Sequence, residues 1–295
     1  MVNQPFQARR IAPGTWIVTG EGCDCYLLEG DREALMIDAG MSTADIRAFA
    51  QGLTDRPLRR VVNTHSHFDH TGGNGFFDEV LATPRAARSL KNTMGAPAAW
   101  YPLDYRVTPI ADGDVLDLGG RRLRVLELDC HSPGDVALLD PDRRLLFTGD
   151  EVESGQVLLL PGYAEEPGQT HAKPAATVET CLRTMERLAA LRGEYDALCP
   201  AHNGSPLDPV YVDWFIALCR AVSEGQVGDP DCSSPSYNSG ATHFPYPHAG
   251  YRRAAHKGAS LVYCSALLWD ADLANAGSLP PATPLHLISS YFARQ

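Results

Sequence analysis

Short apolar runs, bounded by glycine, proline and aspartate, dominate the chain as far as Thr148. Runs of this length and composition are typical of β-strands. From Gly113 onward apolar and polar residues alternate with a period of two, which predicts two successive hairpins. The predicted strands cover residues 11–28 (several, divided at glycines), 34–38, 59–64, 80–82, 115–129, 136–148 and 195–199.

Between these strands lie segments whose apolar residues have helical spacing. A helix is expected from Ile46 to Leu53, capped by Ser42 or Thr43. A short helix should follow Pro84, and two longer ones should cover residues 177–191 and 208–222. The apolar stripe of the helix at 177–191 is of the kind that packs on a sheet.

Three regions lack a regular period. Residues 94–109 contain aromatic residues and prolines, and we expect a loop that could rim a pocket. Residues 225–258 are poor in aliphatic side chains and predict a long loop or lid. Residues 259–295 are expected to supply closing strands, such as 260–263 and 285–292. With neither a repeat nor a clear linker, residues 1–295 are interpreted as one domain.

Composition narrows the classes of partner. The 295 residues carry a formal net charge of -11 and have no basic stripe, so we expect no binding of a nucleic acid polymer and no membrane association. The N-terminus has no apolar segment of the secretory kind, and the eight cysteines are scattered. A cytoplasmic location with reduced thiols is expected. The oligomeric state is open, a homodimer being one option.

Candidate functional side chains are most closely spaced between His65 and His70. Three imidazoles and the carboxylate of Asp69 follow a predicted strand, and Gly72 and Gly73 come directly after them. Alternation along a strand edge would place His65 and His67 on one side, and the following loop could turn Asp69 and His70 towards a second ion. Neutral imidazole nitrogens and carboxylate oxygens are ligands of divalent metals such as zinc.

Three further candidates occupy equivalent positions. His131, Asp150 and His202 each follow a predicted apolar strand where the chain turns. Strand ends in a layered sheet protein share one edge, so these side chains could converge on the histidine cluster.

Taken together, the motifs resemble those of the metallo-β-lactamase fold superfamily, in its glyoxalase II-like and lactonase-like branches. The residues from Thr64 to Asn74 match its Thr-His-x-His-x-Asp-His-x-Gly-Gly-Asn signature, and the segments 35–40, 146–150 and 200–204 resemble its other motifs. The resemblance covers roughly residues 11 to 220. It implies an α/β fold arranged as a four-layer αββα sandwich.

The resemblance also implies a dinuclear metal site. His65, His67 and His131 would hold one ion, Asp69, His70 and His202 the other, and Asp150 would bridge them. Asp38 would hydrogen-bond a ligand imidazole and fix its tautomer. The family usually has glycine before the third histidine, where Cys130 stands here; we expect this to alter the local backbone and not the ligation.

The implied enzyme is a hydrolase with two divalent ions, Zn²⁺ foremost, with Fe and Mn suiting the same ligands. A metal-bridged hydroxide would cleave an ester-like bond of a small molecule, namely a thioester, lactone or β-lactam, with Asp69 and Asp150 as catalytic residues. Tyr163, His171, Trp100 and Tyr101 are candidate substrate contacts. A phosphodiesterase of small substrates and a single-iron sulfur dioxygenase remain alternatives.

Overall fold

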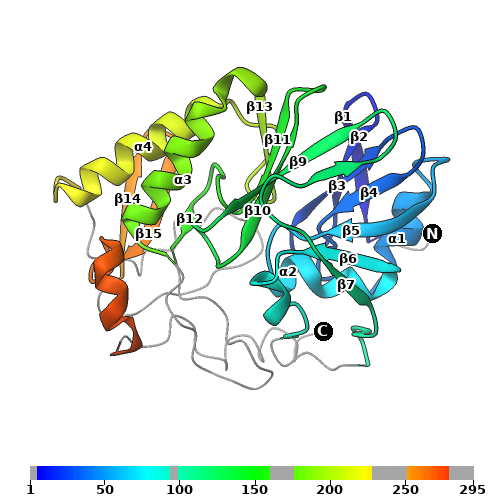
Figure 1. The fold of residues 1–295 in the computed structure, drawn as a ribbon, viewed down its shortest axis with the longest axis horizontal. Coiled ribbons are helices and arrows are strands. Elements are labelled where there is room, and N and C mark those ends of the chain that lie inside the picture. Colours follow the sequence, from blue (N-terminus) through cyan, green and yellow to red (C-terminus); the bar gives the residue numbers. More distant parts are fainter. Residues whose placement is uncertain (1–4, 94–98, 160–175, 228–250, 279–295) are drawn as a thin grey trace.

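Three β-sheets form the framework of the computed structural model, which describes residues 5–93, 99–159, 176–227 and 251–278 (Figure 1). The first sheet has seven strands in sequential order, β1 to β7. They are β1 (Gln7–Ala12), β2 (Thr15–Thr19), β3 (Asp24–Glu29), β4 (Ala34–Ile37), β5 (Leu58–Val62), β6 (Glu79–Ala82) and β7 (Arg106–Pro109). Strands β1 to β4 pair antiparallel and β4 to β7 pair parallel.

The second sheet has five strands in the order β13-β11-β10-β9-β8. They are β8 (Val115–Asp117), β9 (Arg122–Leu128), β10 (Asp135–Asp140), β11 (Leu145–Gly149) and β13 (Ala197–Pro200). Strands β8 to β11 form the two hairpins that the period of two predicts. Strand β13 joins β11 in parallel, with Phe147 opposite Cys199.

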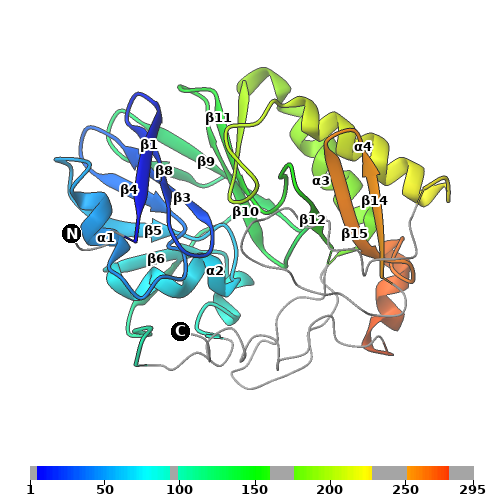
Figure 2. The same ribbon diagram turned by 180° about the vertical axis from the view of Figure 1, so that it is seen from behind.

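The two sheets pack face to face, and helices cover their outer faces. Along β10, Val136 and Leu138 contact the core between the sheets, whereas Ala137 and Leu139 contact α3 (Val178–Ala190) and α4 (Val210–Ser223). On the far side α1 (Ile46–Gln51) packs on the first sheet through Ile46 and Ala50. Figures 1 and 2 show these four layers, which make up the αββα sandwich.

Helix α1 begins differently from the expectation. Its N-cap is Asp45, whose carboxylate accepts the Ala48 N–H at 2.8 Å, and not Ser42 or Thr43. Ser42 instead accepts the Ala44 N–H, which closes the turn before the helix. The region after Pro84 forms only a short 3-10 helix, Ala86–Arg88, instead of an α-helix.

A small third sheet corrects the predictions for the C-terminal region. Strand β14 (Tyr251–His256) occupies the end of the expected loop 225–258, and pairs with β15 (Ala259–Cys264) and through it with β12 (Val157–Leu158). Strand β15 confirms the strand expected at 260–263. Beyond it the chain forms a 3-10 helix, Asp270–Ser278, within the region 259–295 that was expected to supply closing strands. Residues 228–250 and 285–292 lie outside the described ranges. The sequence of β14 is Tyr-Arg-Arg-Ala-Ala-His, which has no alternation of large apolar and polar residues and therefore gives little hydrophobic signal of a strand.

Strand β7 at residues 106–109 also departs from the expected loop 94–109. It forms the edge of the seven-stranded sheet, and its side chains are mostly exposed. An edge strand needs few apolar residues, which explains the missing period. Within the described ranges, no helix combines the length and hydropathy that crossing a membrane requires.

A buried ion pair ties the two large sheets together. Arg121 is fully buried and its Nε donates to Asp140 Oδ2 at 2.8 Å. The same guanidinium donates to the Gly14 carbonyl and to Thr15 Oγ1, in the turn before β2 and at its start. Burial lowers the pKa of Arg121 to about 10, although the Asp140 charge opposes this, and the side chain stays cationic at neutral pH.

We expect Arg121→Met to lower the free energy of unfolding by about 3–5 kcal/mol, because Asp140 would keep a buried and uncompensated charge. Urea denaturation measures the loss. The double variant Arg121→Met/Asp140→Leu should regain most of it, since it removes both charges. Equal stability of wild type and Arg121→Met would contradict a structural role for the pair.

Candidate metal centre

The candidate ligands lie where strands end at one edge of the sandwich. His65 and His67 follow β5, and Asp69 and His70 belong to the single-turn helix α2 (Phe68–Thr71). His131 follows β9, Asp150 follows β11 and His202 follows β13. Parallel pairing of β11 with β13 brings the last two side chains together. The structure thus gathers all seven predicted ligands in one place.

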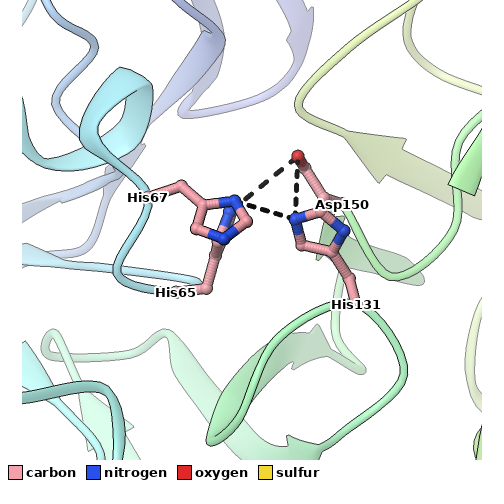
Figure 3. A group of neighbouring side chains, drawn as sticks. All are labelled: His65, His67, His131 and Asp150. Atoms are coloured by element: carbon pink, nitrogen blue, oxygen red, sulfur yellow. Dashed lines mark hydrogen bonds and ion pairs between the residues drawn. The ribbon is translucent and has the colours of Figure 1, made fainter. Parts of the chain in front are cut away.

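The first group consists of His65, His67, His131 and Asp150, whose ligand atoms all lie within 4.8 Å of one another. His131 Nε2 lies 2.9 Å from His67 Nδ1, and Asp150 Oδ2 lies 3.6 Å from His131 Nε2. The four side chains come from three separate segments and point towards a common centre (Figure 3). All four are buried.

The second group consists of Asp69, His70 and His202. Asp69 Oδ2 lies 3.3 Å from His202 Nε2 and 3.6 Å from His70 Nε2. Asp150 reaches this group as well, with Oδ1 at 3.4 Å from His70 Nε2 and Oδ2 at 3.5 Å from His202 Nε2. Asp150 therefore lies between the two groups.

The donor set fits divalent ions. His65 Nε2 and Asp150 Oδ1 are buried and find no hydrogen-bond partner in the described part of the chain. Buried polar atoms without partners are costly, and a bound ion would satisfy both. Imidazole nitrogens and carboxylate oxygens are donors that zinc, iron and manganese accept.

Further hydrogen bonds orient the imidazoles. Asp38 Oδ2 lies 2.9 Å from His70 Nδ1, which is the contact expected of Asp38, and both Asp38 oxygens accept from Thr64. Asp38 has a φ of 58°, a left-handed conformation that aspartate tolerates better than most residues. His131 Nδ1 lies 2.9 Å from the Leu158 carbonyl, which fixes its tautomer.

The pKa values of the imidazoles differ between the two groups. Burial, and then the neighbouring imidazoles, hold the pKa of His65 and of His67 well below its usual range, so both rings are neutral. Burial also opposes protonation of His202, but the charges of Asp150 and Asp69 outweigh it and raise its pKa. The first group is thus already in the form that binds metal.

Two buried glutamates beside the ligands were not anticipated. Glu151 accepts the backbone N–H groups of Cys130 and His131, the latter at 2.8 Å, and burial raises the pKa of Glu151 to about 7. Glu153 accepts from Asn203 at 2.8 Å, and burial followed by the Asp150 charge raises its pKa to about 8. Acidic residues usually signal a surface, and only the neighbouring Gly149-Asp150 motif could have drawn attention to them.

Cys130 is fully buried, and His131 beside it lies in the first group. The candidate substrate contacts have different outcomes. Trp100 is 40% exposed, whereas Tyr101 is buried, donates its hydroxyl to the Met41 carbonyl and packs on Phe68. Their roles stay predictions, and Tyr163 and His171 lie outside the described ranges.

The sequence model of the metallo-beta-lactamase superfamily matches residues 18–202, a range that contains all seven candidate ligands. The chain belongs to the metallo-beta-lactamase superfamily. Acyl-coenzyme A thioesterase MBLAC2 of Bos taurus is 29% identical over 218 residues, covering 62% of this chain and 74% of the relative. Hydroxyacylglutathione hydrolase of Ectopseudomonas mendocina is 26% identical over 209 residues, covering 68% and 72%.

Solved structures agree on the fold. The crystal structure of the DIM-1 metallo-beta-lactamase superimposes with a TM-score of 0.57 at 18% identity, and the match covers 74% of this chain and 99% of that one. At this identity the similarity supports the fold alone. It leaves the substrate undetermined.

For this superfamily member we expect Asp38→Asn to weaken metal binding about 10–100-fold, as loss of a partner behind a ligand typically does. Asparagine tolerates the left-handed backbone but has one oxygen fewer to accept from Thr64 and His70. Competition with a chromophoric chelator measures the affinity. Unchanged affinity would show that Asp38 serves packing alone.

Proposed function

We propose that this protein is a two-metal hydrolase that cleaves an ester-like bond of a small molecule, with thioesters ahead of lactones and β-lactams. One observation carries the proposal: two groups of metal donors share the carboxylate of Asp150. Zn²⁺ is the first candidate for both ions, and Fe or Mn would suit the same donors.

The proposed role of each residue follows from its position. His65, His67 and His131 would hold one ion, Asp69, His70 and His202 the other, and Asp150 would contact both. Such a pair of ions, when bound, acidifies a water from a pKa of ~15.7 towards ~7 and polarises the scissile carbonyl. The Asp69 side chain is 34% exposed, more than the other six, so it can orient the attacking water and receive its proton.

The relatives support a thioester substrate. One is named as a thioesterase of acyl-coenzyme A, and the other as a hydrolase of hydroxyacylglutathione. In both of these compounds an acyl group is attached to sulfur. A thiolate leaves readily, so the active site needs no strong general acid for that step.

Removing the shared carboxylate or one histidine should abolish turnover. We expect His67→Ala and Asp150→Ala each to lower kcat by 10³-fold or more, about 4 kcal/mol, while the circular dichroism spectrum stays native. His256→Ala, in β14 outside the two groups, is the matched control and should keep wild-type activity. Full activity in either site variant would contradict a two-metal mechanism.

Metal removal and a substrate screen test the reaction class. We expect two metal ions per chain by elemental analysis, loss of activity with a chelator and recovery with Zn²⁺. Cleavage should favour acyl-coenzyme A and acylglutathione thioesters over lactones, β-lactams and phosphodiesters. Cleavage of phosphodiesters alone would overturn the proposal, and sulfur-dependent oxygen uptake with one iron per chain would establish a dioxygenase instead.

A further inference from the structure

His202 differs from three of the other four ligand histidines in how its imidazole is held. His65, His70 and His131 each have Nδ1 close to a hydrogen-bonding oxygen, from Thr64, Asp38 and Leu158 respectively. In the part of the chain that the structure describes, no such partner is found for His202 Nδ1. The orientation of this imidazole therefore depends on the backbone that carries it.

That backbone is tied to the segment that carries Asp150. The Ala201 N–H donates to the Gly149 carbonyl at 3.1 Å, which extends the β11–β13 pairing by one bond. Beyond it, Asn203 Nδ2 donates to Glu153 Oε2 at 2.8 Å, and Ser154 Oγ donates to the Asn203 carbonyl at 2.7 Å. The two ligands are thus bracketed by hydrogen bonds on both sides.

The contact between Asn203 and Glu153 is closely fitted. Asn203 has a φ of 62°, a left-handed conformation that asparagine tolerates. A Cβ on Gly155 would overlap Asn203 Nδ2, so only glycine leaves room for this amide. Glu153 is 2% exposed, and burying a carboxyl there is costly unless it is hydrogen-bonded.

We propose that Glu153 and Asn203 form a clamp that positions His202 against Asp150 and so sets the affinity of the second metal group. Both are positioning residues, since they act through His202. The inference rests on the two-ion centre proposed above. Because the first group contains neither His202 nor its loop, loss of the clamp affects the second ion selectively.

Cobalt binding to the metal-free full-length protein tests the clamp, because visible absorption reports each bound Co²⁺ separately from activity. The wild type should bind two ions in two steps, assigned by the step that His67→Ala and His202→Ala each lose. We expect Glu153→Ala and Asn203→Ala to weaken the second-group step about 10-fold or more and to leave the first unchanged. Glu153→Gln keeps an oxygen for Asn203 and should restore near wild-type binding.

Glu79→Ala is the matched control, because it removes a largely buried carboxylate from β6 that bonds Arg106 and Thr108. Both cobalt steps should survive in it. Unchanged second-group affinity in Glu153→Ala, equal weakening of both steps, or binding in Glu153→Gln as weak as in Glu153→Ala would each overturn the clamp. A single step in the wild type would overturn the two-ion centre itself, and the inference with it.

Discussion

Parallel strand pairing is the constraint on which the candidate metal centre depends. Strands β4 and β5 pair in parallel in one sheet, and β11 and β13 pair in parallel in the other. Parallel neighbours end at the same edge, so Asp38 emerges beside Thr64 and Asp150 beside His202. The Val136 N–H donates across the sheets to the Thr64 carbonyl at 2.7 Å, which aligns the two edges. Strand β9 is linked to β11 by two antiparallel pairings through β10, so it ends at the same edge and carries His131. Ligands far apart in sequence meet because β5, β9, β11 and β13 end together.

Such convergence concentrates charge in a buried place. The carboxylates of Asp38 and Asp150 are largely buried among imidazoles, and the more exposed carboxylate of Asp69 lies beside them. The Asp150 and Asp69 charges raise the pKa of His202, which favours a protonated imidazole at this position. A metal ion bound here would compete with that proton for the His202 imidazole, and its binding would release the proton.

The sequence predicted the parts of the structure that rest on strong local signals. The His65–His70 cluster and the strand ends at His131, Asp150 and His202 have distinctive residue types at distinctive turns, and the structure places them together. Features set by tertiary contact were missed. Glu151 and Glu153 are buried although they follow β11 outside any apolar run, and β14 is a strand only because β15 pairs with it. The cap at Asp45 was missed because Ser42 offered an equally good cap.

The two metal groups differ in how far they are enclosed, and this difference bears on how a substrate reaches them. The His65 and His131 side chains are at most 3% exposed, whereas Asp69 is 34% and His202 18% exposed. Asp69 and His202 are therefore the more accessible ligands, although His70 of the same group is fully buried. Burial of the first group keeps its imidazoles neutral. The more exposed ligands of the second group need other contacts to give them order. Hydrogen bonds from the neighbouring backbone and from the loop at Asn203 supply that order.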